Sequence, residues 1–177
     1  GEKWERHFGE LVIRHRQGKL FTPHQWKRSG AAVAYGLRKM LLLPDLTVWT
    51  FPGEHHEIKH KAPTPGGKFG LERYRLDALA EFAKDTIGEV MYTIHDWSRN
   101  GDRDNDRNDL ADWVTAPVLK LATVIDSEFE GATYRNGSKV DAMICYWRTE
   151  RFVVLGDYWS QLDLRCHYAA SRNRTIV

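Results

Sequence analysis

The sequence predicts an α/β fold in which a central mixed β-sheet is flanked by helices. Apolar residues recur at the helical period in 2–16 and in 69–86. Residues 46–51, 56–61 and 90–94 are short segments that are rich in β-branched and aromatic residues or that alternate between polar and apolar, as strands do. The order strand, strand, helix, strand requires a crossover helix packed on the sheet, which is typical of an α/β domain.

The composition favours a single soluble domain. The 177 residues suffice to bury a core, and 42% hydrophobic and 28% charged residues are ordinary for a soluble protein. No segment approaches the roughly 20 apolar residues that cross a bilayer, and the charged start from Glu2 is unlike a signal peptide. Cys145 and Cys166 lack the C-x-x-C spacing of iron–sulfur and zinc motifs, so we expect a reducing, cytoplasmic compartment.

The first helix is expected over residues 2–16 and ends before Gly18. Its buried face is formed by Trp4, Phe8, Leu11 and Val12. Thr22 and Pro23 have the residue types of a helix cap and first position, which predicts a second helix extending as far as Met40.

The middle of the chain predicts a β-hairpin followed by a helix and a strand. Residues 46–51 and 56–61 form the two hairpin strands, with the turn at 52–53. A long helix is expected over 69–86 and an apolar strand over 90–94.

The C-terminal half is less regular in its pattern. Residues 98–109 are expected to form a polar loop, and 116–125 are apolar without favouring helix or strand. Strands are predicted at 139–147 and 151–155, and the basic tail from Arg165 is expected to fray.

The predicted hairpin also brings together the candidate catalytic and metal-binding residues. Glu57 and Lys59 are two apart on one strand and share a sheet face, whereas Ile58 points to the other face. The turn brings Asp45 to nearly the same level. Two neighbouring carboxylates repel, and a hard divalent cation relieves this repulsion. Asp45, Glu57 and the Ile58 backbone carbonyl could therefore hold Mg²⁺, while Lys59 orients a water or stabilises charge on phosphate.

The letters Pro44-Asp45 followed by Glu57-x-Lys59 resemble the PD-(D/E)XK nuclease superfamily, which includes resolvases and recombination exonucleases. The resemblance implies a restriction-endonuclease-like core of a helix, a three-strand meander, a helix and a further strand. That order fits residues 2–97, and 98–177 would then be a C-terminal extension of the same domain. It also implies a Mg²⁺-dependent deoxyribonuclease, in which Mn²⁺ can substitute and which acts in DNA repair, recombination or phage DNA processing.

By the same resemblance, Asp45 and Glu57 are the metal ligands and Lys59 is the catalytic lysine. The first helix of such proteins often supplies an additional acidic ligand, which Glu5 or Glu10 could provide. The helix after the motif carries Gln and Tyr in several branches of the family. This chain has Glu72, Tyr74 and Arg75 there and lacks the Gln, so the branch stays open.

DNA is the expected partner, and a homodimer is consistent with the small size. Basic residues crowd the N-terminal third and the stretch 59–75, although an ordinary solvated surface explains this distribution equally well. The candidate nucleic-acid contacts are Lys61, Lys68, Tyr74, Arg75 and His95. Two alternatives are a non-catalytic nucleic-acid-binding protein of this fold and an interaction domain in which the motif residues form a surface ion pair.

Two further clusters resemble metal sites less well. His55, His56 and His60 could bind zinc or nickel, but His56 and His60 share the Ile58 face and point away from Glu57. The aspartates of 102–106 resemble the start of a calcium loop, but the later loop positions carry the wrong residues. Both clusters fit ordinary surface residues better.

Overall fold

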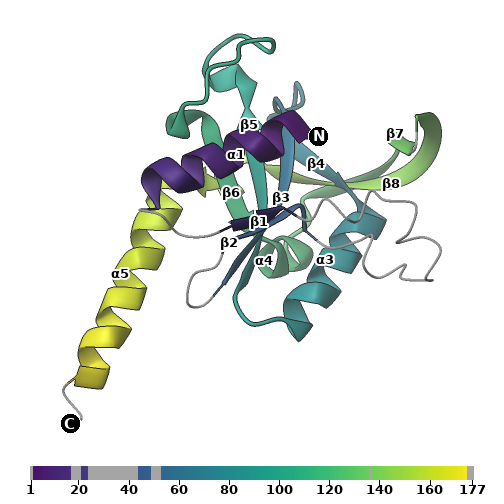
Figure 1. Cartoon of the computed structure of the whole chain (residues 1–177). Helices are drawn as coiled ribbons and strands as arrows, with labels where there is room; N and C mark the ends of the chain where they lie inside the picture. The colour runs from purple at the N-terminus through teal and green to yellow at the C-terminus, as the bar shows by residue number, and fades with distance from the viewer. Residues whose placement is uncertain (1, 17–20, 24–43, 49–52, 136, 175–177) are drawn as a thin grey trace.

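The computed structural model describes residues 2–16, 21–23, 44–48, 53–135 and 137–174, and shows a mixed α/β protein with a central mixed sheet flanked by helices (Figure 1). The central sheet has the strand order β1 (Phe21–Pro23), β2 (Leu46–Val48), β3 (Glu54–Lys61), β5 (Glu89–Asp96), β6 (Trp113–Pro117) and β9 (Val153–Val154). A second sheet has the order β4 (Lys68–Glu72), β8 (Ser138–Arg148) and β7 (Ser127–Arg135).

Four α-helices and three short 3₁₀ turns accompany these strands in the described part of the chain. The α-helices are α1 (Glu2–His15), α3 (Arg73–Asp85), α4 (Val118–Thr123) and α5 (Leu155–Arg174). The 3₁₀ turns are η3 (Trp97–Arg99), η4 (Leu110–Asp112) and η5 (Thr149–Arg151). None of the helices in the described ranges combines the length and the apolar character that a bilayer crossing demands.

The central sheet is mixed because β3 and β5 are parallel while its other neighbouring pairs are antiparallel. A parallel pair needs a crossover, and here β4 and α3 supply it. The β2–β3 pairing aligns Leu46 with His56, which confirms that the two predicted strands are antiparallel neighbours. Strand β3 begins at Glu54, two residues earlier than predicted, and residues 49–52 of the predicted strand and turn lie outside the described residues.

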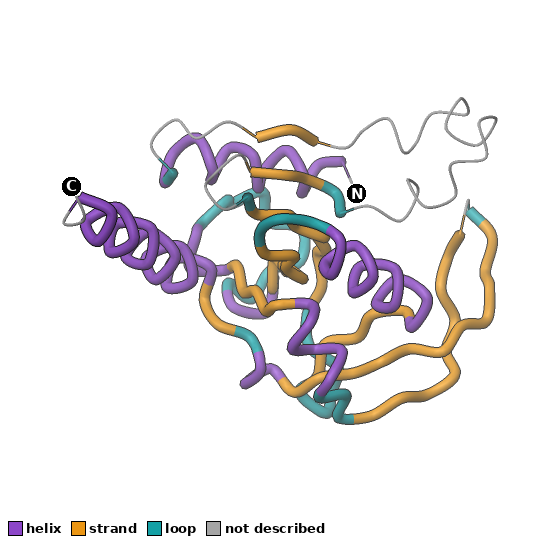
Figure 2. The backbone as a smooth tube through the Cα atoms, turned by 90° about the horizontal axis from the view of Figure 1, so that it is seen from below, coloured by secondary structure: helices purple, strands orange, loops and turns teal. Residues whose placement is uncertain are grey.

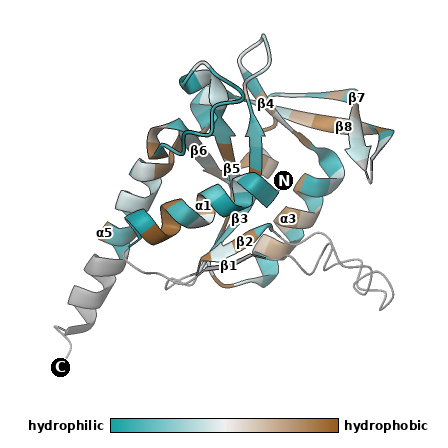
Figure 3. Ribbon diagram, turned by 45° about the horizontal axis from the view of Figure 1, so that its top comes forward, coloured by the Kyte–Doolittle hydropathy of each residue, from teal (hydrophilic) through white to brown (hydrophobic). Residues whose placement is uncertain are grey.

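Helix α1 and the N-terminal part of α5 cover one face of the central sheet, and the rest of α5 extends away from it (Figure 1). The cluster on this face contains Ile58 and Met91 from the strands and Phe8 and Trp159 from the helices. Helix α1 contributes only one side of its surface, and Figure 3 shows hydrophilic and hydrophobic residues alternating along its ribbon. The predicted amphipathic helix is thus confirmed, and its apolar side packs on the sheet.

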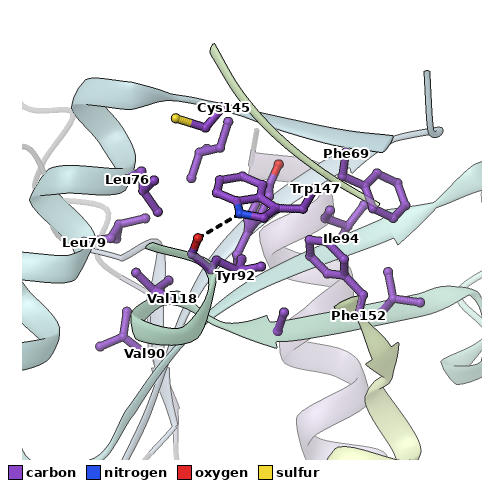
Figure 4. Packing of buried hydrophobic residues seen from close by; sticks show 14 residues of the cluster. Phe69, Leu76, Leu79, Val90, Tyr92, Ile94, Val118, Cys145, Trp147 and Phe152 are labelled. Carbon is purple, nitrogen blue, oxygen red and sulfur yellow. Dashed lines mark hydrogen bonds between the residues drawn. The ribbon is translucent and has the colours of Figure 1, made fainter. Parts of the chain in front are cut away.

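The opposite face packs against α3, α4 and the inner side of the second sheet. Trp147 of β8 lies at the centre of this cluster (Figure 4), where its ring is fully buried. Its indole Nε1 donates a hydrogen bond of 2.8 Å to the Leu121 carbonyl of α4. The far ends of β7 and β8 extend away from this core as a two-stranded arm (Figure 2).

The predicted helix over 69–86 is wrong at its start. Residues 68–72 form strand β4, and the helix begins at Arg73. Phe69 and Leu71 are both buried, as alternate residues of a strand that packs one side on the core. A spacing of two residues places both side chains on one side of a strand but on opposite sides of a helix, and pairing with the distant strand β8 fixes the strand.

The structure also differs from the predicted second helix and from the predicted frayed C-terminal tail. Phe21–Pro23 forms an edge strand instead of a helix start, and the rest of that predicted helix lies outside the described residues. The tail from Arg165 continues helix α5, which the sequence analysis missed although Tyr158, Trp159 and Leu162 are buried along it.

The residues after 97, which we expected to form an extension of the same domain, contribute strands to both sheets. Strands β6 and β9 extend the same sheet as β3 and β5. The apolar segment 116–125 is divided between the end of β6 and helix α4. The predicted strand 139–147 is confirmed as β8. The predicted strand 151–155 is present only as the two residues of β9.

Candidate active site

Asp45, Glu57 and Lys59 meet on one face of the central sheet. Because Leu46 aligns with His56, the same register places Asp45 level with Glu57. The Asp45 carboxylate oxygen Oδ2 accepts a hydrogen bond of 2.8 Å from the Ile58 backbone N–H. This bond holds Asp45 against β3, directly before the first paired residue of β2. The predicted hairpin placed Asp45 in the same position.

The Glu57 carboxylate lies between two cations. It is fully buried, and its Oε1 is 2.6 Å from Lys59 Nζ. Its Oε2 is 2.6 Å from a terminal nitrogen of Arg75, which comes from the first turn of α3. From the sequence we expected Arg75 to contact nucleic acid. Its ion pair with Glu57 could not be predicted, because it depends on where the crossover places α3.

Both cations keep their protons at neutral pH. Burial opposes the charge on Lys59, but the attraction of Glu57 and Asp45 outweighs it and raises the pKa of Lys59. The same balance, with Glu57 as the attracting group, raises the pKa of Arg75. Lys59 is therefore suited to stabilise negative charge on a phosphate and not to act as a base.

The cluster is neutral as it stands, with two acids and two bases, so the repulsion between the carboxylates is already compensated. Among the described residues no group of three or more His, Cys, Asp or Glu side chains could hold a metal ion. A metal here would need backbone and water ligands beside Asp45 and Glu57.

The backbone offers such a ligand. In a β-strand, the N–H and C=O of one residue point to the same neighbouring strand. Since the Ile58 N–H reaches Asp45, the Ile58 carbonyl points to the same side, where β2 has ended. Two carboxylates and one carbonyl suit a hard cation such as Mg²⁺, so the donor set fits once Glu57 exchanges a cationic side chain for the metal.

The two candidates for an additional acidic ligand lie on α1, which covers the opposite face from Glu57. Glu5 is buried in that helix. Glu10 is half exposed and faces His7 and Asn108. We therefore restrict the proposed ligand set to Asp45, Glu57 and the Ile58 carbonyl.

The residues expected to contact nucleic acid differ in their hydrogen bonds and in their exposure to solvent. Lys61 donates a hydrogen bond of 2.7 Å to the Gly70 carbonyl, and Lys68 donates one of 3.0 Å to Ser127 Oγ. Tyr74 is 39% exposed on α3. His95 has no exposed surface, so we leave it out of the proposed contacts.

The histidines of β3 do not converge on one site. His55 bonds Thr47 on the α3 side of the sheet, while His56 bonds Thr93 on the α1 side. His60 Nδ1 lies 2.9 Å from His95 Nδ1. The aspartates of the loop 102–106 also bind groups of the protein itself. Asp106 forms an ion pair with Lys3, and Asp102 accepts a hydrogen bond from the Asp104 backbone N–H.

Because His95 is buried, we expect the protein to lose stability in mild acid. Its ring stacks on Trp4, and burial lowers the pKa of His95 to about 4, with help from His60, His7 and Lys3. Between roughly pH 6.5 and 4 the unfolded chain binds a proton at this residue and the folded chain does not. The free energy of unfolding should thus fall by up to about 3 kcal/mol across this window.

Urea titrations at several pH values, followed by tryptophan fluorescence, measure this effect. We expect His95→Gln to reduce the slope of stability against pH, and His15→Gln, at an exposed site on α1, to leave it unchanged. An unchanged slope in His95→Gln would contradict the assignment.

No protein-family model and no curated protein matches this chain. The proposed function therefore depends on the geometry of the site.

Proposed function

We propose that this protein is a metal-dependent nuclease that hydrolyses phosphodiester bonds in DNA. The observation that carries the proposal is the meeting of Asp45, Glu57 and Lys59 on one sheet face at the end of a β-hairpin. Apart from β4, which joins the second sheet, the order α1, β1, β2, β3, α3, β5 follows the helix, three-strand meander, helix and strand that the PD-(D/E)XK resemblance implies. This order supports the restriction-endonuclease-like core as part of the same proposal.

In this proposal Asp45, Glu57 and the Ile58 carbonyl hold Mg²⁺ or Mn²⁺. A metal bound there would polarise a phosphate oxygen and lower the pKa of a coordinated water. Lys59, which the neighbouring acids keep protonated, donates to the phosphate oxygen on which charge develops. Arg75, once Glu57 turns to the metal, is released and can pair with a phosphate group.

The non-catalytic alternative has one observation in its favour. Both Glu57 oxygens already contact cationic side chains, as expected of an ion-pair cluster that only stabilises the fold. The two functions differ in what the protein does to DNA when metal is supplied.

A substrate panel tests the proposal. We expect linear, nicked, branched or single-stranded DNA to be cut in Mg²⁺ or Mn²⁺, and no cutting in EDTA. RNA in the same panel checks that DNA is the substrate. Lys59→Ala, purified in parallel, should cut at least about a hundredfold more slowly, since it lacks a charge-stabilising donor. DNA binding without cutting in either metal would instead identify a non-catalytic binding protein.

A further inference from the structure

A pocket of about 320 Å³ lies beside the candidate active site, between the segment after β3 and the outer side of the second sheet. Strand β3 leads from Glu57 and Lys59 directly to Lys61 in the pocket wall. The pocket is also lined by Lys68, Gly70, Glu72, Thr133 and Tyr146. The volume is at the lower end of the roughly 300–1,000 Å³ that small-molecule sites occupy.

The pocket wall has an excess of positive charge. Lys61 and Lys68 donate to a backbone carbonyl and to a serine hydroxyl, which are both neutral. Glu72 is the one carboxylate in this wall, and it accepts a hydrogen bond of 2.6 Å from Thr133. Burial, with the nearby Lys59, lowers the pKa of Lys61 to about 8, although Glu72 and Glu57 oppose this shift. An anionic ligand would complement this wall.

The same wall offers an aromatic surface. Tyr146 of β8 lies over Gly70 of β4, where an added Cβ would come within 2.7 Å of the tyrosine ring. The Phe129 side chain is 61% exposed, and its ring centroid is 6.2 Å from that of Tyr146. Aromatic rings next to cations are the combination that binds single-stranded nucleic acid, because bases stack on the rings while the cations contact phosphates.

Building on the proposed nuclease function, we propose that this pocket binds one unstacked nucleotide next to the scissile bond. Its base lies against Tyr146 and its phosphate between Lys61 and Lys68. A base inside an intact duplex is stacked and paired, so it cannot enter such a pocket without being extruded. The preferred substrate is therefore DNA with a single-stranded segment, such as a flap or an overhang.

Binding measured in EDTA separates this inference from cleavage. Fluorescence anisotropy would follow a labelled single-stranded oligonucleotide and a duplex of the same sequence. We expect tighter binding of the single strand by the wild type. Tyr146→Leu should weaken single-strand binding about tenfold, through loss of base stacking, and leave duplex binding unchanged. Lys68→Gln should reduce the slope of log affinity against log salt by about 0.7.

Matched variants on the opposite side of the β7–β8 arm serve as controls. Tyr134, which is 75% exposed, and its strand partner Lys139 face away from Tyr146 by strand alternation. Tyr134→Leu and Lys139→Gln should bind as the wild type does. Tyr146→Phe keeps the ring and should bind as the wild type does, while unchanged duplex binding by Tyr146→Leu shows that its loss of single-strand binding is not misfolding.

The results also distinguish the two proposals. Equal binding of single strand and duplex, or wild-type binding by Tyr146→Leu, would overturn the pocket and leave metal-dependent cleavage standing. Selective, Tyr146-dependent binding without any cleavage in metal would keep the pocket and overturn the nuclease.

Discussion

Glu57→Gln is expected to lower metal-dependent DNA cleavage by about a thousandfold or more. The substitution keeps the shape of the side chain but replaces an anionic ligand with a neutral amide, which binds a divalent cation weakly. The neutral amide also leaves the Lys59 and Arg75 charges without their carboxylate. The change should therefore remove metal binding and reduce stability together.

The control for this prediction is Glu54, a second fully buried carboxylate on the same strand. It lies on the opposite face, where it accepts hydrogen bonds from Arg16 and the Trp159 indole. Glu54→Gln should lower stability in the same way but leave metal binding intact in the folded protein. Calorimetric titration with Mn²⁺ and cleavage rates well below the melting temperature measure the two effects. Full activity of Glu57→Gln would rule out this carboxylate as a ligand.

Trp147→Ala is expected to cost about 3–5 kcal/mol of folding stability. The fully buried ring packs edge-on against Tyr92 of the central sheet, with the ring centroids 6.4 Å apart. Its loss opens a cavity between the two sheets and leaves the Leu121 carbonyl without its indole donor. The effect should be large because this one side chain joins the second sheet to α4 and to the central sheet (Figure 4).

Urea denaturation followed by circular dichroism measures this cost. Trp147→Phe keeps an aromatic ring but no indole N–H, so it should fall between the wild type and Trp147→Ala. Phe129→Ala, on an exposed side chain of the arm, should change stability by less than about 0.5 kcal/mol. A loss below about 1 kcal/mol in Trp147→Ala would mean that the second sheet contributes little to the cooperative fold.

Local patterns in the sequence determined the grouping of Asp45, Glu57 and Lys59. Glu57 and Lys59 share a face because strand residues alternate, and a short hairpin fixes where Asp45 lies. Each of these relations lies within one hairpin, so no knowledge of distant contacts was needed. The helical period of 2–16 determined α1 for the same reason.

Tertiary structure alone decided which groups surround that candidate site. Residues 68–72 became a strand because β8, from a distant part of the chain, supplies its hydrogen-bond partners. That pairing sets where α3 begins and hence brings Arg75 to Glu57. It also places Tyr146 beside Lys61 in one pocket. Propensity and spacing describe a segment by itself, whereas these contacts depend on how remote strands pair.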